Sequence, residues 1–150
     1  MEIRLARMED ADAAYALMCD MEAARLNEEA FRRIYADLLH NPMSPCLVAE
    51  EEGAVIGFLH LRMEEQLCRC ARVSEVMELI VRSDVRSRGV GARLLEAATQ
   101  SAKENGCIRL EVASNKVRER AHAFYRKQGM QQTHVKLTMR LADKGNSMRG

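Results

Sequence analysis

The stretch VRSDVRSRGVGARLLEAA, residues 81–98, combines residues that could bind an anion. Arg86 and Arg88 stand beside Gly89 and Gly91, and a helical pattern of apolar residues begins at the same point. A helix start offers N–H groups without intrahelical partners and the positive end of the helix dipole. Glycines let a ligand approach the main chain, and arginines add charge-assisted hydrogen bonds. This turn is therefore a candidate site for a phosphate group.

Two common phosphate-binding motifs do not fit the turn. It lacks the Gly-Lys-Ser/Thr ending of a Walker loop, and it does not follow the first strand with the G-x-G-x-x-G spacing of dinucleotide-binding folds. The alternative is an ordinary glycine-containing loop with a solvated basic rim. The pattern Arg-x-x-Gly-x-Gly alone does not decide between the two.

Hydrophobic periodicity places the turn in an alternating series of strands and helices. The predicted elements, in chain order, are a strand over 3–7, a helix capped by Asp10 or Asp12, a helix over 28–39, two strands within 46–63 joined at Glu52-Gly53, a strand over 73–81, a helix from Gly89–Gly91 to Glu104, a strand over 107–113, a helix over 118–128 and a final strand over 133–141. This order predicts a mixed α/β sheet with helices on both faces. We expect one domain over 1–141 and a flexible tail over 142–150.

Composition limits the class of protein. The chain has 150 residues, of which 47% are hydrophobic and 30% charged, with a net charge of +1. This balance is typical of a soluble globular domain and does not favour general binding to nucleic acid or to a membrane. The five cysteines are scattered, and no stretch resembles a secretory signal or a membrane span, so we expect free thiols in the cytoplasm. Cys68 and Cys70 are predicted to share a strand face, and without a second ligand pair we expect no metal site.

Two motifs in this order resemble the GCN5-related N-acetyltransferase (GNAT) superfamily. The first is ELIV followed by Arg86-x-x-Gly89-x-Gly91, and the second is SNKVRERAHAFYRKQGM, which ends in Phe-Tyr-x-x-x-Gly. The resemblance runs to about Leu141 and implies a mixed, mostly antiparallel sheet whose fourth and fifth strands splay apart for acetyl-CoA. The positions that it implies for contact with acetyl-CoA are Leu79, Ile80, Val81, Arg86, Ser87, Arg88, Gly89, Val90, Gly91, Ala92 and Asn115.

A narrower resemblance concerns the amine that would be acetylated. SEVMELIV, the second motif and the closing strand are similar to the aminoalkylphosphonate N-acetyltransferases, which acetylate primary amines. Those enzymes tend to carry a histidine-rich segment before the fourth strand, where this chain reads LCRCARV (67–73). The resemblance therefore fixes neither the amine nor any metal dependence.

Transfer of an acetyl group to an amine needs a base. An alkyl ammonium has a pKa near ~10, so it must lose a proton before it attacks a thioester. Glu75 and Glu78 lie in an otherwise apolar strand, where a carboxylate is costly unless it is paired or used. Residues three apart point to opposite faces of a regular strand, unless a bulge intervenes. We expect Glu75 to be the base, acting through water, with Glu78 second; the alternative for each is an ion pair with a core arginine such as Arg109.

The resemblance also implies how the other steps occur. A main-chain N–H of Leu79, Ile80 or Val81 would stabilise the oxyanion. Tyr125, at the family's tyrosine position, would protonate the leaving thiolate, although it could also be only a packed aromatic residue. Asn115 could equally be a helix cap. The isolated histidines are assigned no role: His60, His122 and His134.

Rival functions and substrates stay open. A non-catalytic acyl-CoA sensor would need no carboxylate or tyrosine, and a nucleic-acid binder is disfavoured by the near-neutral charge. An aminophosphonate would need local cations, for which the candidates are Arg62, Arg69 and Arg72. An aminoglycoside, polyamine or protein amine would need acidic walls, for which the candidates are Glu64 and Glu65. A homodimer is expected from the resemblance.

Overall fold

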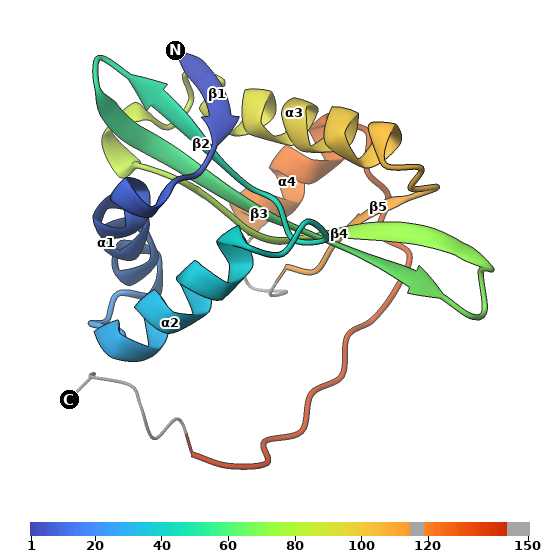
Figure 1. Cartoon of the computed structure of the whole chain (residues 1–150). Coiled ribbons are helices and arrows are strands. Elements are labelled where there is room, and N and C mark those ends of the chain that lie inside the picture. The colour runs from blue at the N-terminus through green and yellow to red at the C-terminus, as the bar shows by residue number, and fades with distance from the viewer. Residues whose placement is uncertain (115–118, 144–150) are drawn as a thin grey trace.

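The computed structural model describes residues 1–114 and 119–143, which form a five-stranded sheet with helices on both faces (Figure 1). The elements are β1 (Glu2–Leu5), α1 (Ala11–Glu22), α2 (Glu28–Leu39), β2 (Cys46–Glu51), β3 (Ala54–Gln66), β4 (Ala71–Val81), α3 (Val90–Glu104), β5 (Leu110–Val112) and α4 (Glu119–Lys127), with short 3-10 turns at Met8–Asp10 and Ser83–Val85. The predicted α/β order is confirmed as far as α4.

The strands follow one another across the sheet in chain order, β1-β2-β3-β4-β5. The first four strands pair antiparallel, and β5 pairs parallel with β4. The sheet is thus mixed and mostly antiparallel, as predicted. The parallel pair is made possible by α3, which carries the chain back across the sheet between the two strands.

Each face of the sheet has its own apolar core. Helices α1 and α2 cover one face, with a core that includes Leu17, Tyr35, Phe58 and Ile80. Helix α3 covers the other face, where Leu94 and its neighbours pack on alternate residues of β2, β3 and β4. Neighbouring strand residues, such as Leu47 and Val48 or Phe58 and Leu59, therefore belong to different cores, as the period of two requires.

Close approach of α3 to β3 depends on one glycine. A Cβ atom at Gly57 would lie 2.9 Å from Leu94 Cδ1 and 3.1 Å from Val90 Cγ1. These distances are too short for a side chain, so the helix sits directly against the main chain of β3. The first turn of α3 is thereby fixed beside the ends of β3 and β4.

Three local predictions are wrong. Residues 133–141 contain no strand, although they alternate between apolar and polar residues. Cys68 and Cys70 lie exposed in the turn between β3 and β4 instead of on one strand face, because the hairpin reverses at these residues. Asp10 precedes α1 but does not cap it with its side chain, because its carboxylate accepts hydrogen bonds from Arg4 and from the Arg7 N–H.

No helix in the described part of the chain is long and apolar enough to cross a membrane.

Candidate active site

A β-bulge in β4 decides where the two candidate carboxylates point. His60 pairs with Glu78, and the next residue of β3, Leu61, pairs with Val76, so that Met77 is an extra residue. Because of this extra residue, Glu75 and Glu78 lie on the same face of the sheet. Glu75 pairs across the strands with Arg62, and Glu78 pairs with His60. A regular strand would have pointed the two carboxylates to opposite faces. The exception allowed for in the sequence analysis, a bulge between them, is present.

The bulge coincides with the point at which β4 and β5 part. The last paired residues are Val76 and Val112, and β4 continues to Val81 without β5 beside it. The Arg82 N–H donates to the Ile56 carbonyl at 2.8 Å, and N–H groups alternate in direction along a strand. The N–H groups of Leu79 and Val81 consequently face the opening, whereas that of Ile80 faces β3.

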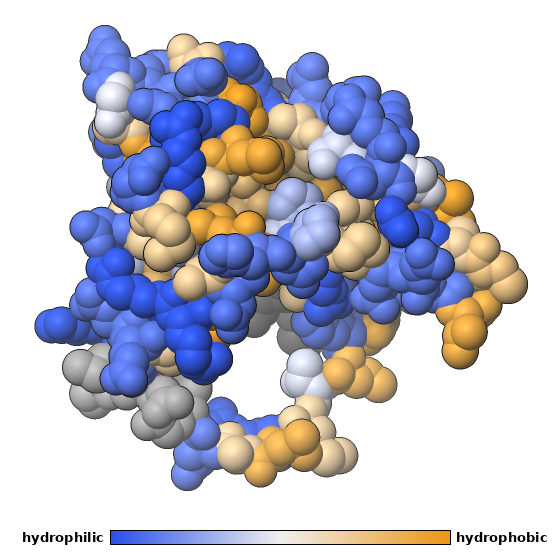
Figure 2. Space-filling model, viewed as in Figure 1, coloured by the Kyte–Doolittle hydropathy of each residue, from blue (hydrophilic) through white to orange (hydrophobic). Residues whose placement is uncertain are grey.

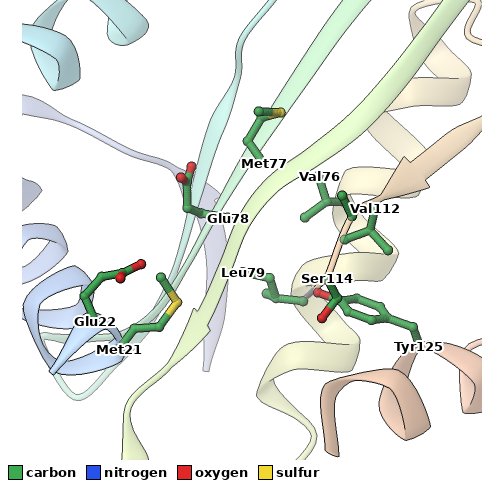
Figure 3. A pocket seen from close by; sticks show the side chains of 10 residues that line it. Met21, Glu22, Val76, Met77, Glu78, Leu79, Val112, Ser114 and Tyr125 are labelled. Carbon is green, nitrogen blue, oxygen red and sulfur yellow. The ribbon is translucent and has the colours of Figure 1, made fainter. Parts of the chain in front are cut away.

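A pocket of about 200 Å³ occupies this opening (Figure 3). Its wall is made by the end of α1, by β4, by the end of β5 and by α4. The lining residues are Met21, Glu22, Val76, Met77, Glu78, Leu79, Val112, Ala113, Ser114 and Tyr125. In Figure 3, Glu78 lies on the side of β4 that faces Met21 and Glu22, whereas Tyr125 and Ser114 lie across the strand beside Leu79. The opening thus connects the two faces of the sheet.

On the α1 side, Glu78 is held by a histidine. His60 Nδ1 lies 3.2 Å from Glu78 Oε2, and the His60 side chain is 11% exposed against 38% for Glu78. His60 Nε2 is buried and has no hydrogen-bond partner among the described residues. Cys46 pairs with His60 in the neighbouring strand, and its burial, helped by the negative charge of Glu78, raises the pKa of the Cys46 thiol to about 12. Glu78 therefore sits between the pocket and a largely buried imidazole.

Glu75 has a different environment. Its Oε1 accepts a hydrogen bond of 2.9 Å from Arg62 Nη2, and it is not among the residues that line the pocket. Glu75 thus forms an ion pair, as the alternative to a catalytic role predicted, but its partner is Arg62 and not a core arginine. Arg109 instead pairs with Glu111, at 3.0 Å.

On the opposite side, α4 brings Tyr125 to the pocket. The adjacent Phe124 packs against the first turn of α3, where a Cβ atom at Gly91 would lie 3.4 Å from Phe124 Cζ. The Ser114 hydroxyl is buried without a hydrogen-bond partner among the described residues, and it lines the same pocket. A hydroxyl and a phenol consequently border the opening on the α3 and α4 side.

The turn before α3 has the geometry of an anion site. The first intrahelical hydrogen bond runs from the Arg93 N–H to the Gly89 carbonyl at 3.1 Å, so the N–H groups of Val90, Gly91 and Ala92 have no intrahelical acceptor. Gly89 has φ +82°, a value that favours glycine, and a Cβ atom there would meet nothing within 4 Å. Ser87 also has a positive φ, of 73°. The curled turn leaves the helix end open to a ligand.

The arginines of this turn differ in their availability. Arg82 binds Asp84 through two hydrogen bonds, of 2.6 and 3.1 Å, and Arg88 pairs with Glu51 at 2.8 Å. Arg86 donates to the Val81 carbonyl at 3.3 Å, a bond to a neutral group. Arg86 is therefore better placed than Arg88 to turn toward an added anion.

The structure brings together only part of the predicted site. Glu78, Leu79 and Tyr125 share the pocket, and the residues of the turn share the start of α3. The Ile80 side chain is buried in the core under α1 and α2, and Asn115 lies outside the described residues. His60, Ser114, Met21 and Glu22 were not predicted; the one available signal was that His60 lies two residues from Arg62 on the strand that pairs with the two glutamates.

No group of three or more His, Cys, Asp or Glu side chains within residues 1–114 and 119–143 is arranged to hold a metal ion.

Comparison with known proteins identifies the family. The family model described as "Acetyltransferase (GNAT) family" matches residues 11–130. An aminoalkylphosphonate N-acetyltransferase of Salmonella typhimurium is 34% identical over 140 residues, which cover 93% of this chain and 91% of the relative. Among solved structures, a transcriptional regulator from Bacillus halodurans superposes with a TM-score of 0.87 at 22% identity, covering 93% of this chain and 99% of that one. An aminoglycoside antibiotic 6'-N-acetyltransferase from Acinetobacter haemolyticus superposes with a TM-score of 0.82 at 19% identity, covering 95% and 99%.

The sheet with its splayed β4 and β5, the open start of α3 and these similarities agree with one another. The chain belongs to the GNAT family of acetyltransferases and is an N-acetyltransferase that depends on acetyl-CoA.

Proposed function

We propose that the chain transfers the acetyl group of acetyl-CoA to the primary amine of a small molecule, with Glu78 as general base and Tyr125 as general acid. One observation carries this assignment: the pocket at the β4–β5 opening has the carboxylate on one side of β4 and the phenol on the other. An amine and a thioester can then meet in the opening from opposite faces of the sheet.

Binding of acetyl-CoA begins at the turn before α3. The N–H groups of Val90, Gly91 and Ala92, with the side chain of Arg86, would hold the diphosphate. From there the pantetheine arm would run along β4, whose Leu79 and Val81 main-chain groups face the opening. The buried Ser114 hydroxyl supports this path, since a bound arm would supply the hydrogen-bond partner that it lacks among the described residues.

Chemistry then follows in three steps. Glu78, directly or through a water molecule, takes a proton from the ammonium, and the nitrogen lone pair attacks the acetyl carbon. A C–N bond forms, and the carbonyl oxygen becomes an oxyanion that the Leu79 or Val81 N–H stabilises, a contact typically worth ~3 kcal/mol. The C–S bond breaks as the oxyanion collapses, and the thiolate of CoA receives a proton from Tyr125. The nitrogen, positively charged after attack, would lose its second proton through water to the tyrosinate, which leaves a neutral amide and restores Tyr125.

Glu78 is preferred over Glu75 as the base because of their partners. Glu75 accepts a hydrogen bond of 2.9 Å from Arg62, does not line the pocket, and is therefore held away from a substrate amine. Glu78 instead contacts His60, which can hold the carboxylate in place without competing as a fixed cation. We therefore assign His60 a positioning role.

The relative from Salmonella typhimurium supports an aminoalkylphosphonate as the first candidate substrate. The three arginines that could bind a phosphonate are already paired, Arg62 with Glu75, Arg69 with Glu111 at 4.0 Å and Arg72 with Glu65 at 3.1 Å. Their ion pairs would have to rearrange to bind such a substrate.

A second candidate is a polycationic amine, such as a polyamine or an aminoglycoside. Glu22 and Glu78 are the charged residues of the described pocket wall, and two carboxylates favour a substrate with more than one positive charge. We place the reaction in the cytoplasm, since all five cysteines are free thiols, which suits a reducing compartment.

A thiol-release assay over aminoalkylphosphonates, polyamines, aminoglycosides and amino acids tests the proposal. We expect CoA to be released from acetyl-CoA in the presence of at least one of these amine classes and not in its absence. A matched measurement uses Glu22→Gln, which should raise the KM of a polyamine more than that of an aminophosphonate. Tight CoA binding with no turnover of any amine would contradict catalysis and favour an acyl-CoA sensor.

A further inference from the structure

A buried hydroxyl without a partner lies on the wall of the pocket. The Ser114 oxygen is buried, the residue lines the β4–β5 opening, and the oxygen makes no hydrogen bond to any described residue. Residues 133–141 supply none, since Figure 2 shows the segment after α4 as an arc below the body, with open space between the two. Burying a hydroxyl without a partner destabilises a folded protein. An unpaired hydroxyl on a pocket wall therefore indicates a group that binds beside it.

A second buried serine shows how such a hydroxyl is ordinarily satisfied. Ser74 is 1% exposed, and its hydroxyl donates to the Arg109 carbonyl at 2.7 Å, which ties β4 to the chain entering β5. Ser114 instead lies beyond the last pair of these strands, Val76 and Val112. Since the strands have parted there, the neighbouring strand no longer offers an acceptor of this kind.

The Ser114 hydroxyl lies where the sulfur of a bound thioester would be. Figure 3 shows Ser114 and Tyr125 beside Leu79, on the side of β4 away from Glu78. The Leu79 N–H faces the opening, where it would bind the oxygen of the acetyl group. The sulfur is bonded to the same acetyl carbon, so a carbonyl held at Leu79 brings the sulfur to this wall. This step rests on the acetyl-CoA site proposed above.

We propose that Ser114 is a further catalytic residue, whose hydroxyl donates a hydrogen bond to the sulfur of CoA as the C–S bond breaks. A thioester sulfur is a weak acceptor, whereas a thiolate is charged and accepts a much stronger hydrogen bond. The contact therefore strengthens as the electron pair of the C–S bond moves to sulfur, which is the condition for raising the rate. Ser114 keeps its proton, because an alkoxide is far more basic than a thiolate, and the proton of the thiol still comes from Tyr125.

Ionisation of bound CoA tests this contact without any amine. A thiolate absorbs ultraviolet light, so the thiol of CoA can be titrated on the protein, with the desulfo-CoA complex as the blank for the protein's own cysteines and tyrosines. A donor at the sulfur favours the thiolate, so Ser114→Ala should lower the acid dissociation constant of the bound thiol about tenfold. Ser114→Thr keeps the hydroxyl and should restore it. Ser74→Ala, which removes a buried hydroxyl outside the described pocket wall, is the matched control and should leave it unchanged.

The stability of the free chain distinguishes an unpaired hydroxyl from one with a structural role. Ser114→Ala should leave the melting temperature unchanged or raise it, because no hydrogen bond is lost. Ser74→Ala should lower it, because the Arg109 carbonyl loses a donor. With a saturating amine, Ser114→Ala should lower kcat about tenfold and change the affinity for CoA by less than about threefold.

Two results would overturn the inference. One is a bound thiol that ionises equally in the unmodified chain and in Ser114→Ala, which would leave the roles of Glu78 and Tyr125 unaffected. The other is an equal loss of affinity for CoA and desulfo-CoA in Ser114→Ala, because the hydroxyl would then bind the pantetheine arm and not the sulfur. The expected loss of ionisation without turnover of any amine would support the contact and contradict the proposed acetyl transfer.

Discussion

Tyr125→Phe is expected to slow acetyl transfer by about 10²- to 10³-fold, while CoA affinity changes by less than about threefold. The substitution removes only the phenolic oxygen, and the ring that lines the pocket and lies against Phe124 stays in place. Without a proton donor, the CoA thiolate must leave as an anion, in an opening where Ser114 is the other hydroxyl of the described wall. The rate of acetyl transfer should therefore fall far more than the affinity for CoA.

The measurement pairs single-turnover kinetics with calorimetric titration of CoA. The variant and the unmodified chain must be compared at a saturating concentration of the amine, so that a change in KM is not mistaken for a change in kcat. Phe124→Leu serves as the control, because Phe124 packs on Gly91 and should mainly affect cofactor binding. If Tyr125→Phe weakened CoA binding and left the rate at saturation unchanged, the tyrosine would be a packing residue and not an acid.

Glu78→Gln is expected to lower kcat/KM by about 10²- to 10⁴-fold near neutral pH. Glutamine keeps the size and much of the polarity of the side chain but cannot accept the proton of the ammonium. The loss should shrink as the pH rises toward the pKa of the amine, because more of the substrate then arrives already deprotonated. A pH profile of kcat/KM from about 7 to 10 checks both the size and the trend of the effect.

Glu75→Gln is the matched control on the same strand and the same face. It breaks the hydrogen bond with Arg62 but leaves the described pocket wall unchanged, so we expect less than about a tenfold loss. His60→Gln should fall between the two, since it removes the support of the Glu78 carboxylate and not the base itself. A larger loss from Glu75→Gln than from Glu78→Gln would reverse the assignment of the base.

Elements with strong and local signals could be predicted from the sequence. The helix over 28–39 has a clear apolar stripe with Asn27 as its cap, and Glu52-Gly53 turns between β2 and β3 as a hairpin signal should. The turn at Gly89 was recognisable because glycines and arginines precede a helical pattern. These features depend on neighbouring residues and not on the rest of the fold.

The features that could not be predicted from the sequence depend on residues far away along the chain. The bulge at Met77 arises from the register of β4 against β3, and it brings to one face two glutamates that a regular strand would separate. His60 became part of the site only because that register sets it opposite Glu78. The alternation over 133–141 predicted a strand that the structure does not contain, because alternation alone does not supply a neighbouring strand with which to pair.

The most direct test concerns the open main chain at the start of α3. Amide spectra of the ¹⁵N-labelled chain would be recorded as CoA is added, and again with pantetheine, which lacks the diphosphate. We predict that the largest shifts with CoA belong to Val90, Gly91 and Ala92 and that pantetheine leaves these amides nearly unchanged. Unmoved amides at these positions while CoA binds, or no binding of CoA at all, would contradict a diphosphate site at this turn.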